Sequence, residues 1–186
     1  MTYRRGFKSE ADGYARSIRE ELGLAPHAPL CAWKLANYLG YVVYPLSDYA
    51  KLEPAAYAYL TSERGKREFS AITLFGETQA FIIHNDAHHQ HRQSANISHE
   101  VAHGLLIHTP APLAAADGNR NFDAEQEREA NWLGPALLVS KEAALHIVET
   151  RMERAAARTL YHVSEELLEM RLRMSGALIR ARRRVA

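Results

Sequence analysis

Hydrophobic residues in the first forty positions recur at helical spacing. In 9–24 the apolar side chains lie four residues apart, and the pattern stops at Gly23. A second run, 30–40, is also helical in pattern and ends at Gly40. We therefore predict two short N-terminal helices joined by a proline-containing linker.

The pattern then changes to runs of β-branched and aromatic residues with turn residues between them. Pro45 ends the first run, and Gly76 marks a turn before the last. The predicted strands cover 41–46, 55–61, 68–75 and 79–85. Together they predict a small, mostly antiparallel β-sheet.

Helical spacing returns in 94–108, and most of this segment is apolar. Ser94 is the predicted N-cap, and Pro110 and Pro112 are the predicted stop. A polar loop of small residues follows over 111–121. We expect a buried helix that is separated from the next helix by this loop.

The rest of the chain is predicted to be helical. Residues 122–161 form one long pattern, which we expect to kink or break at Gly134-Pro135. Ser164 is the predicted cap of a last helical pair, with a turn at Gly176. The order of elements predicts an α+β fold that is mainly helical.

Composition and charge narrow the class of protein. A length of 186 residues suits a single domain, 1–186, and a formal net charge of +1 is too small to indicate a nucleic-acid partner. The single cysteine, Cys31, excludes an internal disulfide framework and fits a reducing compartment. The N-terminal residues lack the apolar run of a secretory signal, and no segment approaches the roughly 18 apolar residues of a membrane span. We expect a soluble cytoplasmic protein.

Residues 96–106 contain His99-Glu100-x-x-His103, the helical zinc-hydrolase signature. Residues four apart lie on one face of a helix, so the two imidazoles can bind one ion. Glu100 lies about 100° round the helix and can reach a water held by that ion. Zinc lowers the pKa of such a water to about 7, and the carboxylate can take its proton.

The alternative is an amphipathic helix whose histidines are four apart by chance, because the motif is short. Its setting favours the metal site. The histidines lie within an apolar run that includes Ile97, Val101 and Leu105, so the helix should be buried. Buried imidazoles and a buried carboxylate need polar partners, and a metal ion supplies them.

A catalytic zinc needs a third protein ligand, and the next helix opens with Glu125, Glu127 and Glu129. Glu127 falls on the side of the downstream apolar stripe, so we predict it as the ligand and expect the other two to be solvated. Asn131, one turn later, is a candidate to orient a ligand histidine. The alternative is that all three glutamates form a charged helix start, which the helix dipole favours.

Segments 96–108 and 127–140 together resemble the ImmA/IrrE family of zinc metallo-endopeptidases, and the resemblance extends over about 10–176. The chain departs from the family pattern at 94–96, 133–135 and 139–140. None of these positions is a predicted ligand. These departures from the family pattern affect the expected shape of the substrate cleft.

The resemblance implies that His99, His103 and Glu127 bind Zn²⁺ and that Glu100 is the general base. It also implies a zincin-like fold of the thermolysin type, in which the motif helix packs against the glutamate helix. The implied substrate is a helix-turn-helix transcriptional repressor whose cleavage relieves repression, for example in a stress response. No direct contact with nucleic acid or membrane is implied.

Within the single domain we expect a catalytic core at 10–155 and a helical extension with a basic tail at 156–186. Tyr57, Tyr59 and His84 are candidates to stabilise the oxyanion of the reaction. The edge of the sheet at 80–85 is a candidate to bind an extended substrate as an added strand.

Other polar groups have two interpretations each. His88, His89 and His91 beside Asp86 are either a second metal site or a hydrophilic loop. The basic end, 179–186, either contacts an acidic partner or nucleic acid, or is a solvated terminus. His108 is expected to lie off the ligand face at the end of its helix.

Three functions are compatible with these features. The leading one is an intracellular zinc endopeptidase. The alternative is a non-catalytic, zinc-containing regulatory protein that binds and sequesters a repressor, although a structural zinc would have no use for Glu100. A DNA-binding regulator that uses the C-terminal helices is disfavoured by the small net charge.

Overall fold

The computed structural model describes residues 3–109 and 123–185, so the predicted loop at 111–121 and the two prolines expected to end the motif helix lie outside the described part. The helices and strands, in chain order, are α1 (Phe7–Glu21), α2 (Ala32–Tyr38), β1 (Tyr41–Pro45), η1 (Leu46–Tyr49), α3 (Pro54–Thr61), α4 (Gly65–Glu68), β2 (Ala71–Phe75), β3 (Ala80–His84), α5 (Gln90–Leu105), α6 (Ala124–Leu138), α7 (Lys141–Glu149), α8 (Arg154–Tyr161), α9 (Glu165–Met174) and α10 (Ala177–Val185). The fold is α+β and mainly helical, as the sequence predicts.

The three strands form one mixed sheet in the order β1-β3-β2. β2 pairs with β3 in antiparallel fashion, with Thr73 opposite Ile82, and β1 pairs with β3 in parallel, with Tyr41 opposite Ala80. The sheet is therefore less antiparallel than the sequence suggests. Because β3 is central, the prediction that 80–85 is an exposed edge is wrong, and the two edges belong to β1 and β2.

The segment 55–61, predicted as a strand, is helix α3. Pro54 occupies the first turn, where its fixed φ favours a helix, and three of the next four residues are alanine, in a helix with no buried residue. A strand needs one side packed on a core to define its register. This segment has none, and local helix propensity decides its structure.

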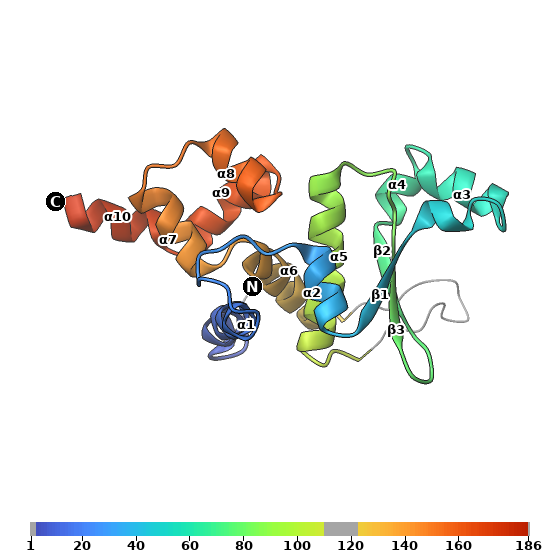
Figure 1. The fold of residues 1–186 in the computed structure, drawn as a ribbon, viewed down its shortest axis with the longest axis horizontal. Coiled ribbons are helices and arrows are strands. Elements are labelled where there is room, and N and C mark those ends of the chain that lie inside the picture. Colours follow the sequence, from blue (N-terminus) through green and yellow to red (C-terminus); the bar gives the residue numbers. More distant parts are fainter. Residues whose placement is uncertain (1–2, 110–122, 186) are drawn as a thin grey trace.

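Helix α5 lies at the centre of the molecule, between the sheet and helix α6 (Figure 1). It begins at Gln90 with His89 as N-cap, five residues before the predicted N-cap Ser94, which is instead a buried residue inside the helix. Ile97, Val101 and Ala102 are fully buried in the core that α5 shares with α1, α2 and α6. The motif helix is therefore buried on one side, as expected from its apolar pattern.

Helix α6 runs through Gly134 and Pro135 without a break, contrary to the prediction. The break comes instead at Val139, and Ser140 caps the next helix by accepting a hydrogen bond from the Ala143 N–H at 3.0 Å. Proline removes one backbone donor, but Ser98 Oγ of α5 donates to the Gly134 carbonyl at 2.8 Å and ties this part of α6 to its neighbour.

Two buried arginines bind the carbonyl groups at the end of α6. Arg19 Nη2 of α1 donates to the Leu137 carbonyl at 2.8 Å, and Arg171 Nε of α9 donates to the Val139 carbonyl at 3.0 Å. The last carbonyls of a helix lack partners within it, so these contacts satisfy groups that would otherwise be buried and unpaired. These hydrogen bonds fix the end of α6 against α1 and α9.

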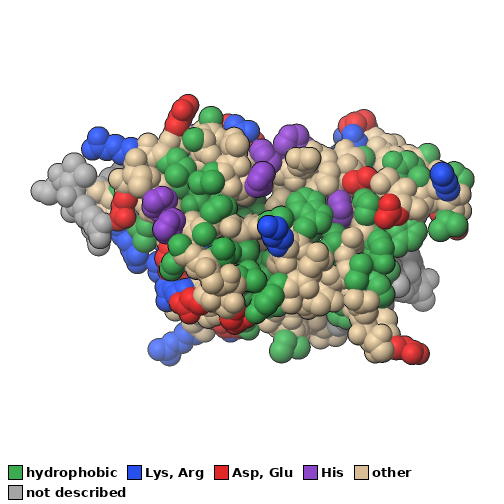
Figure 2. Space-filling model, viewed as in Figure 1, with side chains coloured by type: hydrophobic (Ala, Val, Ile, Leu, Met, Phe, Trp, Pro, Cys, Tyr) green, Lys and Arg blue, Asp and Glu red, His purple; other side chains and the backbone are tan. Residues whose placement is uncertain are grey.

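Helices α7 to α10 gather at the end of the molecule opposite the sheet (Figure 1). Ser164 caps α9 by accepting a hydrogen bond from the Leu167 N–H, and Gly176 adopts a φ of 75° in the turn before α10, both as predicted. Acidic and basic side chains are scattered over the face drawn in Figure 2 among hydrophobic and neutral surface. Within the described ranges, no helix combines the length and the apolar character needed to cross a membrane.

Candidate metal centre and active site

His99 and His103 lie one turn apart on α5, and their Nε2 atoms point at each other across 3.0 Å. The two side chains are 24% and 23% exposed, so they lie at the border between the core and solvent. This position keeps the rings in place through packing while leaving one side of the pair accessible.

Glu127 reaches this pair from α6. Its Oε2 lies 3.5 Å from His99 Nε2, and its Oε1 lies 3.4 Å from His103 Nε2. Asp123 places the glutamate in the first turn of α6, because its side chain caps the helix by accepting hydrogen bonds from the N–H groups of Glu125 and Gln126. The three predicted ligands therefore converge from two helices.

The spacing of these atoms fits one small cation. An ion with tetrahedral ligands at about 2.0–2.1 Å separates neighbouring ligand atoms by roughly 3.3 Å. The three contacts among His99, His103 and Glu127 measure 3.0 to 3.5 Å. In the described part of the chain, this is the group of three metal-ligating side chains whose ligand atoms come together.

The contacts with His103 and His99 hold the pKa of the Glu127 carboxyl well below its usual range. The carboxylate is therefore ionised at neutral pH, although burial acts in the opposite direction. An ionised oxygen beside two imidazole nitrogens is a ligand set suited to a divalent metal.

The close approach of α5 and α6 depends on Gly134. A Cβ atom at this position would lie 3.1 Å from the backbone nitrogen and Cα of His99 and 3.2 Å from the Ser98 carbonyl. Only a residue without a side chain lets the two helices meet at this distance without a shift. The glycine in the predicted break is therefore a packing residue of the metal centre.

Glu100, the residue after His99 on α5, contacts strand β2 of the sheet. Thr73 Oγ1 of β2 donates a hydrogen bond to Glu100 Oε2 at 2.7 Å. The hydroxyl of Tyr41 from β1 packs where a side chain at Gly104 would stand, on the same helix face as Glu100. Burial raises the pKa of Tyr41, and the nearby Glu100 carboxylate raises it further.

Thr73 and Tyr41 are polar neighbours of Glu100 that sequence analysis missed. Both residues are β-formers in short strands, so in the sequence they are indistinguishable from ordinary sheet residues. The weak signal for Tyr41 is Gly104, directly after the second histidine, which leaves room for a large side chain from another element.

The solvent exposure of the three glutamates at the start of α6 differs from the prediction. Glu125 is exposed, as expected, but Glu129 is only 6% exposed. Glu129 forms an ion pair with Arg4, and its Oε2 lies 3.4 Å from His108 Nε2. The expectation of a solvated Glu129 is wrong because Arg4 and His108, distant in sequence, provide its partners.

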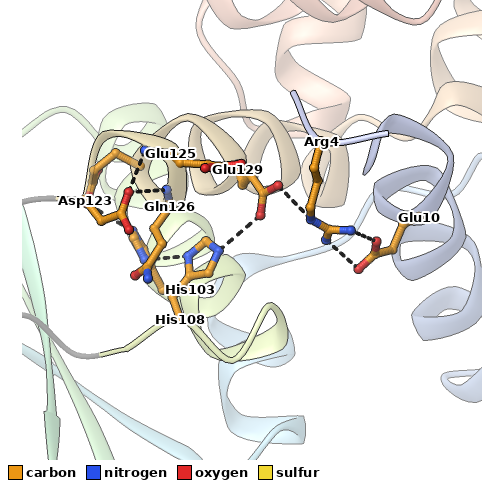
Figure 3. Close-up of polar contacts among 9 residues, drawn as sticks. Arg4, Glu10, His103, His108, Asp123, Glu125, Gln126 and Glu129 are labelled. Atoms are coloured by element: carbon orange, nitrogen blue, oxygen red, sulfur yellow. Dashed lines mark hydrogen bonds and ion pairs between the residues drawn. The ribbon is translucent and has the colours of Figure 1, made fainter. Parts of the chain in front are cut away.

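His108 also departs from the prediction, since it turns back onto the ligand pair. Its Nδ1 lies 3.0 Å from the Nδ1 of His103, and its side chain is 6% exposed. Burial lowers the pKa of His108, although Glu129 opposes this effect. Figure 3 shows how His103, His108, Glu129 and Arg4 follow one another.

The structure does not give Asn131 the predicted role. This residue is exposed on α6, and within 3–109 and 123–185 neither His99 nor His103 forms a hydrogen bond with its side chain. For His103, the position facing Nδ1 is taken by His108.

The three candidates for oxyanion stabilisation lie away from the metal centre. Helix α3, which carries Tyr57 and Tyr59, follows the Pro45 end of β1, whereas Tyr41 lies at the other end of that strand. The Tyr59 hydroxyl donates a hydrogen bond to Glu68. His84 lies at that same end of the sheet, opposite Pro45 in β1, buried with its ring edge on Trp33. The described structure brings none of the three to the ligand pair.

The second histidine group lies at the start of α5. The rings of His89 and His91 are 4.6 Å apart, while His88 turns inward and its Nε2 lies 3.4 Å from the Phe69 carbonyl. Asp86 accepts a hydrogen bond from the Ser47 N–H. These side chains point to different partners, so the described structure does not assemble them into a metal site, and His91 lies in α5 rather than in a loop.

Comparison with known proteins places this geometry in a family. Residues 49–173, which are 125 of the 186 residues, match the family model Peptidase_M78, described as IrrE N-terminal-like domain. No curated protein and no solved structure gives a significant match. The matched region includes both helices of the metal centre and the strand that carries Thr73. The chain thus belongs to the IrrE N-terminal-like family, Peptidase_M78, and is a metallopeptidase-type domain.

Proposed function

We propose that this protein is a zinc-dependent endopeptidase that uses His99, His103 and Glu127 as metal ligands and Glu100 as general base. The observation that carries the proposal is the convergence of the three ligand atoms within 4.8 Å of one another, with Glu100 one residue away on the adjoining helix face. A structural metal site would not require that carboxylate.

The ligand set favours zinc among the common divalent ions. Two imidazole nitrogens and one carboxylate oxygen form the catalytic set of the thermolysin type, which leaves one position for water or substrate. Magnesium and calcium prefer oxygen ligands alone. When bound, zinc would polarise the scissile carbonyl and lower the pKa of a water molecule to about 7.

Glu100 then supplies the proton transfers. Its Oε2 is held by Thr73, so its Oε1 is the oxygen available to take a proton from the attacking water. The protonated carboxyl can give that proton to the leaving amine when the peptide bond breaks. Tyr41, with its pKa raised by burial and by Glu100, stays protonated and can donate a hydrogen bond on this side of the helix.

The edge of β2 is the proposed binding position for the substrate backbone. Within the described residues β2 pairs with β3 alone, and the Thr73 side chain reaches Glu100 from this strand. An extended peptide added to β2 would pass close to the carboxylate, and main-chain hydrogen bonds would align it. This edge replaces the one predicted from the sequence.

We propose a cytoplasmic helix-turn-helix transcriptional repressor as the substrate, with cleavage relieving repression. Support for this choice comes from the resemblance of the sequence to the ImmA/IrrE family. Acidic and basic groups are interspersed on the face shown in Figure 2, and the net charge is +1, so a protein substrate is favoured over nucleic acid.

The test compares the Glu100→Gln variant with the matched variant Glu125→Gln, which changes an exposed glutamate near the same site. Each purified protein is incubated with zinc and with the helix-turn-helix protein encoded beside its gene, and metal content and cleavage are measured. We expect both variants to bind one zinc ion and only Glu125→Gln to cleave. Full cleavage by Glu100→Gln would overturn the role of the base.

The same assay separates the alternative function, a non-catalytic zinc protein that sequesters a repressor. In that case the wild-type protein would bind the repressor without producing fragments, and Glu100→Gln would bind it equally well. Loss of zinc from Glu127→Gln without loss of repressor binding would also favour sequestration over catalysis.

A further inference from the structure

Helix α5 ends in a turn that returns the chain onto its own last residues. The N–H of Ile107 donates to the Gly104 carbonyl at 3.0 Å, and the N–H of His108 donates to the His103 carbonyl at 3.0 Å. This is the hydrogen-bond pattern of a Schellman motif, which brings the residue after the turn against the helix residue five positions earlier. A hydrophobic pair usually fills this contact, whereas here it joins His108 to His103.

The turn is maintained at a cost in backbone energy. Ile107 has a φ of 53°, and its side chain is 89% exposed. A β-branched residue in the left-handed region is strained, and glycine is the usual residue here. The Ile107 side chain is too exposed for its packing to explain this conformation. The conformation instead allows the contact between His108 and His103.

The hydrogen bonds have a defined direction. The carboxyl of Glu129 is paired with Arg4, and a carboxylate oxygen accepts hydrogen bonds, so the His108 Nε2–H donates to Glu129 Oε2, 3.4 Å away. A neutral imidazole has one donor and one acceptor, so His108 Nδ1 accepts from His103 Nδ1, 3.0 Å away. His103 Nε2 is then unprotonated and faces Glu127 and His99, as a metal ligand requires.

The contacts that run from His103 through His108 to Glu129 end at an arginine from the N-terminal segment. Arg4 Nε lies 2.8 Å from Glu129 Oε1, and its other nitrogens make two hydrogen bonds to Glu10 at 2.6 and 2.9 Å. Glu129 is buried, and an unpaired carboxylate there would be costly. Arg4 pairs with Glu129 Oε1, which leaves Oε2 to accept the hydrogen bond from His108 (Figure 3).

We propose that His108, Glu129 and Arg4 are positioning residues that fix the tautomer and the ring orientation of His103. This inference rests on the proposed metal centre. Carboxylate groups that orient ligand histidines directly are common, and their loss typically weakens metal binding about 10- to 100-fold. Here a second imidazole lies between the carboxylate and the ligand, and the first segment of the chain takes part in the metal site.

Three variants separate the hydrogen bonds from ring packing. His108→Phe keeps an aromatic ring but removes both hydrogen bonds, whereas His108→Asn keeps an acceptor near the position of Nδ1. His146→Phe is the control, because that ring stacks on His27 in another part of the fold. Zinc affinity is measured by competition with a chromophoric chelator, and ¹⁵N NMR measures the coupling across the His103–His108 hydrogen bond in metal-free and zinc-loaded protein.

We expect the wild type to show a coupling between the two Nδ1 atoms. We expect His108→Phe to weaken zinc binding about 10-fold or more, His108→Asn to recover most of the loss, and His146→Phe to match the wild type. No coupling, or unchanged zinc affinity in a folded His108→Phe, would overturn the proposal. A wild-type protein that shows the coupling but binds no zinc would instead refute the proposed function, while the hydrogen bond between His103 and His108 would be confirmed.

Discussion

The hydroxyl of Thr73 donates a 2.7 Å hydrogen bond to the carboxylate of Glu100, and this contact joins the sheet to the motif helix. The proposed ligands lie on α5 and α6, whereas the side chain of the proposed base, Glu100, is hydrogen-bonded to β2. The proposed ligands and the proposed base therefore have separate supports. Changes in the sheet should alter the proton transfer without releasing the metal.

Replacing Thr73 with valine should lower the cleavage rate and leave zinc bound. Valine has nearly the same shape but cannot donate, so Glu100 loses one partner and can rotate away from the water. A hydrogen bond to a charged group contributes about 1.5–3 kcal/mol, which corresponds to about 10- to 100-fold in rate. The measurement is kcat with the repressor substrate, together with zinc content.

Thr73→Ser is the matched variant, because it retains the hydroxyl and removes only a methyl group. It should retain most of the activity. If valine and serine have the same effect on kcat, the methyl contact rather than the hydrogen bond matters, and Thr73 does not position the base.

Replacing Tyr41 with phenylalanine tests the second polar neighbour of Glu100. The ring packing stays and the hydroxyl over Gly104 is lost, so kcat should fall by about 100- to 1,000-fold if this group stabilises the oxyanion. Tyr59→Phe removes the hydroxyl that binds Glu68 and should leave kcat unchanged. The opposite ranking of the two variants would restore the assignment made from the sequence.

Local sequence was sufficient to predict that His99 and His103 lie together on α5, because two histidines four apart on an apolar helix define a face. Glu127 also followed from helical periodicity and from the resemblance to a family. The role of Glu129 could not be predicted, since its burial depends on Arg4, more than a hundred positions away, and on a turn with a strained Ile107. Residues whose partners come from distant segments have no periodic signal.

The sheet shows the same limit. Its strands at 41–46, 68–75 and 79–85 were predicted, but their order was not, because the parallel pairing of β1 with β3 joins segments that are distant in the sequence. The error at 55–61 has another cause. Alternating tyrosines imitate a strand, but no core lies on either side of this segment, so Pro54 and the alanines determine a helix.

Replacing Gly134 with alanine should destabilise the protein and weaken zinc binding, although alanine is intrinsically the better helix former by about 1 kcal/mol. The added Cβ would lie 3.1 Å from the His99 backbone, so α6 must shift away from α5 and carry Glu127 with it. Overpacking of this kind costs about 1–3 kcal/mol. Thermal unfolding and zinc competition measure the two effects.

Gly13→Ala is the matched control. Gly13 also lies within a helix, α1, but a Cβ atom there would meet nothing within 4 Å. This variant should gain about 0.5–1 kcal/mol in stability and bind zinc normally. Equal stabilisation by both substitutions would show that α5 and α6 are not in tight contact at Gly134.

Removal of the metal should lower the melting temperature, because the proposed zinc site is assembled from two helices of the folded chain. At a free zinc concentration about 100 times the dissociation constant, binding stabilises the fold by about 2.7 kcal/mol. For a domain of this size, that corresponds to a shift of about 5–10 °C between zinc-loaded and chelated protein. His99→Ala lacks one ligand and should melt at the same temperature with or without chelator, and an equal chelator-induced shift in that variant would place the stabilising metal elsewhere in the chain.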